Sequence, residues 1–510
     1  MKKNDLVLIA LAAVYVVLFN VSACGVNHLV FSIIEIFAIL LLNPTSLYKQ
    51  KFWLIAVSLL LTGVASFYYG TILPLVANSI AAILLPTVAF QASNSLFVNF
   101  FNSFYALIAS PIVVLINSFT PKDNEATKAS FNIKKVVLFF LALGVSLFFL
   151  GFYCFSNPLL VSFIEKINFD FFSWQMVYYF MIGLWFSYLI VYPIYNKYIG
   201  DRDLAAPNLL TENNQSLRSF MERFISLENE AFLGLMLFGL VNLFLLLSNG
   251  LDCYYLFVKK AMPSDVTFSE YVHGGAYSVV ISIFFATLVV LFFFRNQINF
   301  LLENKAIKTV ALLWIIQNIA TVLFAMNRAY WYIQTYGMTY KRIGLLFYLF
   351  LCMVGLATVF IKIISPKTNW YLFRVNFIVV YTTLIFSSFF DWDVIITRFN
   401  LTNFQNEKTM AIDEKFLVDL SYTNLPLLYQ FYVIENKNLV WQYNNDFFDF
   451  DSSSSNFRSY SKEDMSSLVQ EKYKALQQQL KNGKWQSYCY SKHSVANEIH
   501  QLIENKKNGK

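Results

Sequence analysis

The sequence predicts an all-α protein: a polytopic bundle of transmembrane helices followed by a small, mainly helical C-terminal soluble tail. Composition is the first reason. Hydrophobic residues make up 57% of the 510 residues and charged residues 14%, whereas an average soluble domain carries about 25% charged residues. The second reason is a series of apolar runs, each long enough to cross a bilayer as a helix, that recur as far as residue 390. Lipid cannot satisfy unpaired backbone groups, so these runs are expected to be helices.

The chain offers twelve candidate spans. One of them holds Pro74 and Pro86, each of which removes a helical hydrogen bond, so a broken or re-entrant helix is expected there. We therefore predict about 11–12 spans, with eleven true crossings or twelve with a differently placed N-terminus. In chain order the candidates are 6–23, 27–42, 52–69, 71–91, 96–118, 134–155, 173–196, 231–258, 268–294, 306–330, 342–364 and 370–390.

The distribution of lysine and arginine predicts orientation and localisation. Downstream of residue 119, fourteen of these residues lie in one set of alternate loops and six in the other, and cytoplasmic loops keep the positive excess. We therefore predict a multi-pass protein of the cell inner (plasma) membrane whose C-terminal tail is extracytoplasmic. The basic loops are expected to contact the headgroups of the lipid bilayer. No basic patch suggests a nucleic-acid partner.

Composition changes at Asp391, which predicts two domains: a transmembrane helical domain at 1–390 and a soluble C-terminal tail at 391–510. Helices are predicted in the tail near 412–421, 425–435 and 461–480, the last beginning with a capping-box-like S-x-x-D. The apolar stripe of the last helix is too small for an independent core. The tail is therefore expected to pack on the membrane domain or to dock a partner protein of the envelope.

Motifs for metal binding and catalysis are absent from the sequence. The five cysteines include no C-x-x-C pair, which argues against a zinc ribbon or a thioredoxin-like motif. There is no nucleophile elbow, phosphate-binding loop or H-E-x-x-H. We therefore expect no cofactor and no catalytic residue, although enzyme function stays open. Around Cys24, VSACG resembles a lipoprotein cleavage site, but an uncleaved first helix is favoured because another span follows at once.

A carboxyl group lies within the second apolar run. Glu35 belongs to HLVFSIIEIFAILLL, where His28 and Ser32 share its helix face. A charged side chain at the bilayer centre costs about 2.5–3.5 kcal/mol on insertion scales, so such residues face the bundle interior. Two interpretations have equal weight: a ligand or proton site, and a structural glutamic acid that is either protonated or capped by a hydroxyl of a neighbouring helix.

A second polar stripe opens the ninth run at TFSEYVHGGAYS. Thr267 and Glu270 form a capping box, and Glu270, His273 and Tyr277 then lie on one helix face. Helix capping, together with close helix packing at the two glycines, explains the stretch and is favoured. A ligand or proton site is the alternative.

A third stripe follows the tenth run. Gln317, Thr321, Arg328, Tyr332 and Thr335 share one helix face. Arg328 is expected to extend toward the headgroups or to pair with an acid, and we predict Glu270 as that partner. The candidate residues for a ligand or proton site are therefore Glu35, Glu270, His273, Tyr277, Gln317, Arg328 and Tyr332. Amides in apolar runs, Asn78 and Asn242 among them, are expected to make interhelical hydrogen bonds.

Several ordered motifs from residue 230 to 495 resemble a known family. They are EYVHGGAYS, the R-x-x-x-Y-x-x-x-Y-G-M-T-x-x-R pattern from Arg328 to Arg342, Arg398–Asn400, Asp413–Leu417 and Trp485–Tyr488. This combination is similar to the bacterial membrane proteins grouped as domain of unknown function 4173 and its relative 4153. The resemblance implies a bacterial membrane location and assigns no reaction.

Two classes of function fit these observations. The first is solute or proton handling through a polar intramembrane site, which suits the number of spans and the ionisable residues within them. The alternative is a non-enzymatic structural or signalling component of the envelope whose tail docks a partner. A membrane-embedded transferase would need paired acids, and Asp391 and Asp393 diverge on a helix, so its support is thin.

Overall fold

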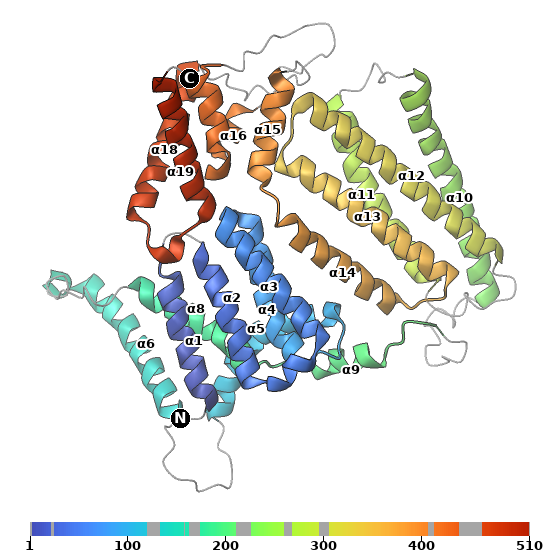
Figure 1. The fold of residues 1–510 in the computed structure, drawn as a ribbon. Coiled ribbons are helices and arrows are strands. Elements are labelled where there is room, and N and C mark those ends of the chain that lie inside the picture. Colours follow the sequence, from blue (N-terminus) through green and yellow to red (C-terminus); the bar gives the residue numbers. More distant parts are fainter. Residues whose placement is uncertain are drawn as a thin grey trace, which may run out of the picture. The chain divides into compact units, whose positions relative to one another are not determined.

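The fold is all-helical, as the sequence predicts (Figure 1). The computed structural model describes residues 3–21, 25–119, 133–157, 159–162, 174–210, 226–259, 268–294, 305–405, 413–437 and 462–508. In this described part no strand occurs, and one isolated antiparallel bridge joins Leu209 and Lys367. The chain divides into two compact units. Unit 1 is Met1–Asp203 with Gly483–Tyr490, and unit 2 is Leu204–Asn482 with Ser491–Lys510.

Unit 1 is a bundle built from the N-terminal apolar helices. Helix α1 packs on α8, and α2, α3, α4 and α5 pack in sequence, each on the next. The loop from α2 to α3 is a short 3-10 turn, Pro44–Tyr48. The helices are α1 (Lys3–Phe19), α2 (Val26–Leu42), α3 (Gln50–Tyr69), α4 (Ile72–Phe90), α5 (Leu96–Phe119), α6 (Ile133–Ser156) and α8 (Trp174–Val191), and α9 (Lys197–Ala205) runs across the boundary between the units.

The expected break in the fourth apolar run is wrong, because α4 is one uninterrupted helix over Ile72–Phe90. Pro74 lies in its first turn, where backbone N–H groups have no intrahelical partner to lose. Pro86 lies in the last turns. Only the bond that its missing N–H would make to the carbonyl of Ala82 is lost there. Both prolines are buried within unit 1, so packing holds the helix together around them.

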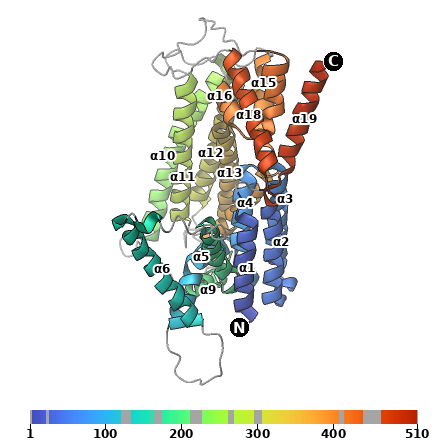
Figure 2. The same cartoon turned by 90° about the vertical axis from the view of Figure 1, so that its left-hand side faces the viewer.

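Unit 2 holds the later spans and the tail helices. Helices α11, α12 and α13 surround one apolar core, and α12 and α13 run side by side in both views (Figures 1 and 2). The helices are α10 (Leu227–Cys253), which continues as a π turn over Tyr254–Lys259, α11 (Phe268–Phe293), α12 (Lys305–Tyr336), α13 (Tyr340–Ile364), α14 (Asn369–Ser387), α15 (Trp392–Gln405), α16 (Glu414–Asp419), α17 (Leu425–Leu428), α18 (Lys462–Asn482) and α19 (Tyr490–Lys507).

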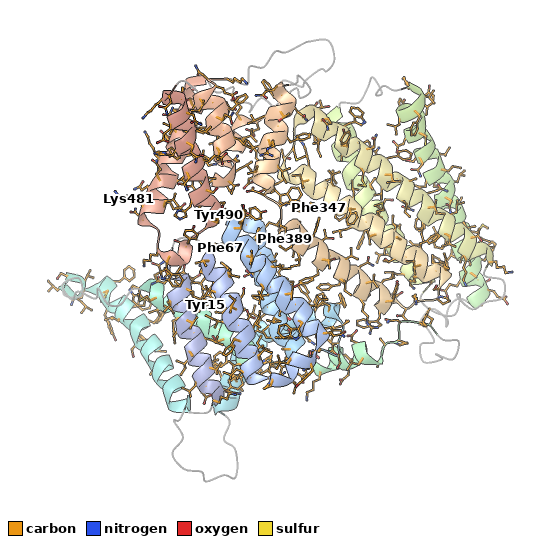
Figure 3. All side chains as sticks on the ribbon, in the orientation of Figure 1. Tyr15, Phe67, Phe347, Phe389, Lys481 and Tyr490 are labelled. Atoms are coloured by element: carbon orange, nitrogen blue, oxygen red, sulfur yellow. The ribbon has the colours of Figure 1, made fainter. Side chains whose placement is uncertain are left out.

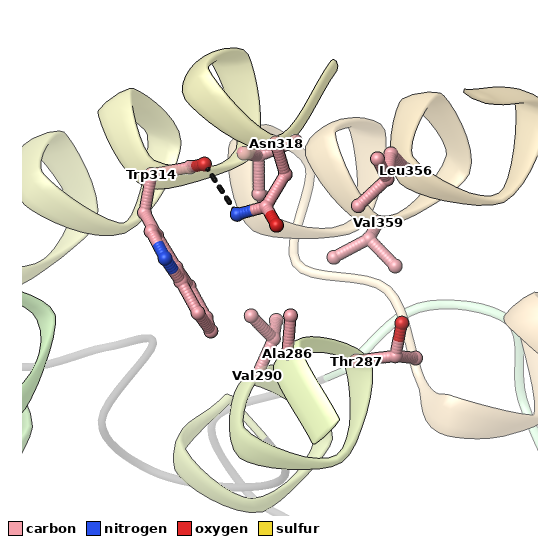
Figure 4. A pocket seen from close by; sticks show the side chains of 8 residues that line it. Ala286, Thr287, Val290, Trp314, Asn318, Leu356 and Val359 are labelled. Atoms are coloured by element: carbon pink, nitrogen blue, oxygen red, sulfur yellow. Dashed lines mark hydrogen bonds between the residues drawn. The ribbon is translucent and has the colours of Figure 1, made fainter. Parts of the chain in front are cut away.

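The core between α11, α12 and α13 is tightly packed. Figure 4 shows the gap between Ala286 and Val290 of α11, Trp314 of α12, and Leu356 of α13, which has no room for a water molecule. The one amide there, Asn318, donates to the backbone carbonyl of Trp314 over 2.8 Å. This interior is therefore structural rather than a binding cavity.

The chain is a multi-pass membrane protein. Among the described residues, eight helices are long and apolar enough to cross a bilayer, and two further apolar helices are shorter. The shorter ones are Val26–Leu42 and Ile281–Phe293. Parts of other predicted spans, such as 134–155, have side chains outside the described residues. The number of eleven or twelve crossings therefore stays a prediction.

The tail helices share one buried apolar cluster, which a residue of α13 joins. Leu417, Leu428, Met465 and Val495 of the tail pack in one buried cluster with Ile343 of α13. The predicted helix at 461–480 corresponds to α18, and those near 412–421 and 425–435 to α16 and to α17 with the π turn that follows it. The domain boundary predicted at residue 390 rests on the change in amino-acid composition. The two compact units divide the chain at other positions, after Asp203 and around 483–490, so the predicted boundary stays a prediction.

Candidate functional site

The predicted site residues fall into three groups. Glu35 lies in unit 1, and Gln317, Arg328 and Tyr332 lie in unit 2. The remaining three are on α11 in unit 2, but the side chains of Glu270, His273 and Tyr277 are outside the described residues. The predicted polar stripe on α11 and the predicted pairing of Glu270 with Arg328 therefore stay predictions.

Glu35 is a fully buried acid near the middle of α2. Its side chain has no solvent exposure. Neither carboxyl oxygen has a hydrogen-bond partner among the described residues. A polar group in this situation destabilises the fold, because burial removes its hydrogen bonds to water and no protein group replaces them. Among the described residues no hydroxyl of a neighbouring helix caps Glu35, so that half of the structural interpretation is wrong. The other half, a protonated glutamic acid, stays a prediction.

Next to Glu35 along α2, polar side chains join three helices at Asn78. The Asn78 Nδ2 of α4 donates to Ser32 Oγ of α2 over 3.1 Å, and to Leu59 O and Thr62 Oγ1 of α3 over 3.0 and 3.3 Å. Its Oδ1 lies 3.4 Å from His28 Nδ1. His28, Ser32 and Glu35 follow one line on α2 at steps of four and three residues. We call His28, Ser32, Glu35 and Asn78 the polar line.

Small residues on α3 allow this convergence. A Cβ atom at Gly63 would lie 3.2 Å from Leu29 Cα of α2 and 3.4 Å from Ser32 Oγ. Ser58, Thr62 and Ser66 are buried and donate their hydroxyls to backbone carbonyls of their own helix, over 2.8 to 2.9 Å. Small residues bring membrane helices into close contact. This is why α2 can place Ser32 against Asn78.

In unit 2, polar side chains of α12 meet α10 along a ladder. Gln317 Nε2 donates to Asn242 Oδ1 over 2.9 Å, and Thr321 Oγ1 donates to Asn249 Oδ1 over 2.8 Å. Arg328 Nη1 then bonds Asp252 Oδ1 at 3.2 Å. The predicted stripe of Gln317, Thr321 and Arg328 thus faces one neighbouring helix. Sequence reasoning missed Asp252, although its place three residues after Asn249 puts both on one face of α10.

An apolar groove between α13 and α14 contributes no ionisable group. It measures about 590 Å³, and aromatic side chains such as Phe347 and Phe386 form much of its wall. Its polar members are Thr382 and Thr383. Among the described residues, no group of three histidines, cysteines, aspartates or glutamates is close enough to hold a metal ion. The polar line and the ladder are therefore the two candidate sites in the described part of the chain.

Residues 6–431 match the model of one protein family, described as Domain of unknown function (DUF4153). The chain belongs to this family. The match confirms the resemblance to the relative 4153 and extends it to the first 200 residues, which include the polar line. No curated protein and no solved structure matches the chain. The DUF4153 description assigns no reaction, so any function has to be argued from the residues.

In this DUF4153 protein, the motif from Arg328 to Arg342 builds the turn between α12 and α13. The Arg342 guanidinium lies 4.4 Å from the ring centre of Tyr332 and donates to the carbonyls of Tyr336 and Gly337 over 2.7 and 2.5 Å. Gly337 has a positive φ of 81°, and a Cβ there would lie 2.8 Å from Asn400 Oδ1. Tyr332 is therefore a packing residue of this turn.

Other polar side chains of the DUF4153 protein form a hub that joins α13, α15 and the tail. Asp393 accepts from Tyr340 Oη over 2.5 Å and from Ser421 N over 3.2 Å. Lys472 Nζ donates to the carbonyls of Val418 and Leu420 over 2.6 and 2.8 Å. Burial lowers the pKa of Lys472 to about 8, although two carboxylates nearby oppose the shift. These groups satisfy one another, which indicates a structural hub.

Proposed function

We propose that this multi-pass membrane protein binds and transfers protons inside the membrane, with Glu35 as the proton-binding group. The observation that carries the proposal is the complete burial of a carboxyl group whose two oxygens have no partner among the described residues. Intramembrane acids of this kind mark proton and ion pathways in membrane proteins.

The size of the site favours a proton over a larger solute. An isolated ionised carboxylate is very unfavourable in such surroundings, so Glu35 must carry a proton or receive a positively charged ligand. Both oxygens are inaccessible to water in the structure. A hydrated ion or an organic solute would need the helices to separate, whereas a proton needs no space. We therefore favour proton handling over general solute transport.

The polar line places polar side chains between Glu35 and one end of α2. His28 lies seven residues before Glu35 on the same face, about 10 Å along the helix axis. Its side chain is only partly buried and contacts Asn78. The two nitrogens of an imidazole ring can accept and donate a proton, so we assign His28 as the entry group. The Ser32 hydroxyl lies between them on the helix face.

The test is proton flux into liposomes. Purified protein is reconstituted in vesicles that contain a pH-sensitive dye, and a potassium diffusion potential drives protons inward. We expect flux above that of empty vesicles, and at least a tenfold loss in Glu35→Gln, which keeps the shape but cannot release a proton. Glu435→Gln is the matched control, because Glu435 is a solvent-facing acid of the tail that pairs with Lys437. Equal flux in wild type and Glu35→Gln would refute the proposal.

Orientation and location are part of the same proposal. The excess of lysine and arginine in alternate loops supports an inner-membrane protein with an extracytoplasmic tail. Fusions of alkaline phosphatase and of a fluorescent protein to the C-terminus test it, because the phosphatase is active only outside the cytoplasm. We expect an active phosphatase and a dark fluorescent fusion. The reverse pattern would place the tail in the cytoplasm.

Docking of an envelope protein by the tail is the second candidate. The observation in its favour is Trp485, whose side chain is 60% exposed within a family-like motif of the tail. A photo-crosslinking amino acid at residue 485 tests this candidate. We expect one protein adduct of defined mass that is lost when the crosslinker is moved to the buried position 489. Adducts with lipid alone would contradict docking and would indicate that the Trp485 ring anchors the tail at the membrane interface.

A further inference from the structure

We propose that residues 483–490, which we call the strap, are a releasable latch that controls access to the polar line. The inference rests on the proposed proton function and adds its regulation by the tail. The strap connects α18 to α19. Both helices belong to unit 2, except for Tyr490 at the start of α19. The strap itself belongs to unit 1. The strap is therefore a segment at which the chain leaves unit 2, enters unit 1 and returns.

Backbone contacts dock the strap on the ends of α1, α2 and α3. Tyr488 O accepts a hydrogen bond from Val26 N, at the start of α2, over 2.9 Å. Gln486 Nε2 donates to Val17 O near the end of α1 over 3.1 Å, and Cys489 Sγ lies 3.6 Å from Tyr68 O at the end of α3. These are backbone groups that helix ends leave without intrahelical partners. The strap thus provides hydrogen-bond partners for backbone groups at the ends of three helices.

Aromatic stacking completes the docked arrangement. The Tyr488 ring stacks on Phe67 with centroids 5.9 Å apart, and the Tyr490 ring stacks on Tyr68 with centroids 4.9 Å apart. Figure 3 labels Phe67 and Tyr490 at this end of unit 1. Stacked pairs at such distances add specificity to burial. The strap is therefore held in one register rather than lying loosely on the surface.

The dock requires glycine at residue 25. A Cβ atom there would lie 2.2 Å from Tyr488 O and 2.7 Å from Tyr488 C. Both are backbone atoms, so no side-chain rotation can relieve the clash. Any other residue at 25 must push the strap away or move the start of α2. Gly25 is not itself a member of the polar line, so a substitution there acts first on the contact with the strap.

The docked strap closes the end of α2 that is nearest to His28. Asn27 Oδ1 accepts from Gly25 N over 2.8 Å and from His28 N over 3.0 Å, and Asn27 Nδ2 donates to Leu18 O over 3.3 Å. Gly25, Asn27 and His28 are therefore one connected group beneath the strap. Release of the strap would expose this group to water, and with it the entry to the polar line.

One polar atom of the strap is left without a partner in the docked state. Gln486 Oε1 is buried and accepts no hydrogen bond in the described part of the chain. A buried acceptor of this kind weakens the docked state relative to a hydrated one. The strap therefore combines a fixed register with an incomplete set of bonds, which suits a contact that has to open.

The test uses Cys489, whose residue is 1% exposed when the strap is docked. In full-length protein that keeps Cys489 as its only cysteine, we measure the rate of thiol labelling and, in liposomes, proton flux. Gly25→Ala is expected to accelerate labelling at least tenfold and to raise flux at least threefold. Gly344→Ala is the control, because a Cβ at Gly344 meets no atom within 4 Å, and it should change neither. Tyr490→Ala, which removes the stacking of Tyr490 on Tyr68, is a milder second variant, chosen in case Gly25→Ala does not fold.

Each outcome decides the proposal. Unchanged labelling in both strap variants would mean that the strap does not release, and faster labelling without higher flux would mean that release does not gate protons. Either result overturns the latch and leaves the proton function standing. Wild-type flux that does not depend on Glu35 would instead overturn the proton function, and the gating role with it.

Discussion

The ion pair between Asp252 and Arg328 gives a quantitative prediction for unit 2. The two atoms are 3.2 Å apart, and the side chains are 15% and 16% exposed. Coulomb attraction at this distance is about 5 kcal/mol for an effective dielectric constant of about 20. Loss of water around both charges offsets more than half of this. We therefore expect a coupling free energy of about 2 kcal/mol between the two residues.

A double-mutant cycle measures this coupling. Asp252→Asn, Arg328→Gln and the double variant are unfolded by denaturing detergent in mixed micelles, and the free energies of unfolding are compared. Each single variant should lose about 2–3 kcal/mol, because a charge inside a membrane helix loses its partner. The double variant should lose clearly less than the sum of the two. A coupling below about 0.5 kcal/mol, the value of an exposed pair, would refute the reasoning.

The same cycle with Glu270→Gln tests the pairing that the sequence predicts. Asp252 already bonds Arg328 in the structure, so we expect the coupling of Glu270 with Arg328 to be smaller than that of Asp252. A larger coupling for Glu270 would make the Asp252 contact the secondary one.

Three further predictions concern other contacts. Asn78→Ala should lower the free energy of unfolding by about 1–2 kcal/mol, because it removes hydrogen bonds to α2 and α3. Ser79→Ala, on the exposed side of α4, should change this free energy little. Equal effects of the two substitutions would contradict the role of Asn78. Gly337→Ala should cost about 1–3 kcal/mol in thermal unfolding, since φ is 81° and Asn400 blocks the Cβ; an unchanged melting temperature would argue against this turn. Burial lowers the pKa of Lys472 from 10.5 to about 8. Between pH 8 and pH 10.5 the unfolded chain therefore binds more protons than the folded chain, and the free energy of unfolding should rise with pH. The same rise in a Lys472→Arg variant would show that Lys472 is not its cause.

The sequence predicts the fold class and the helical segments well because the bilayer restricts both. Composition and run length indicate membrane helices without any knowledge of packing. Segment 71–91 shows where such sequence reasoning fails. The rule that a proline removes a helical hydrogen bond predicted a break in this helix, and no break occurs. The effect of a proline depends on its turn within the helix and on the packing around it, and α4 buries both prolines.

The candidate sites were only partly predictable for a similar reason. The cost of charge in lipid singled out Glu35, and helical spacing placed Gln317, Thr321 and Arg328 on one face, as the structure has them. Spacing within one helix does not say which helix lies opposite. Asp252 was therefore missed as the partner of Arg328. The convergence of three helices on Asn78 is likewise a property of tertiary packing.

The most direct test of the proton site is the infrared absorption of the Glu35 carboxyl group itself. We compare wild-type protein with Glu35→Gln in lipid, in normal and in heavy water. A protonated carboxylic acid absorbs separately from a carboxylate, and its band shifts when the proton is exchanged for deuterium. We predict a band of this kind that is present in the wild type and missing in Glu35→Gln. If the two spectra were identical in that region, Glu35 would carry no proton, and the proposed function would be contradicted.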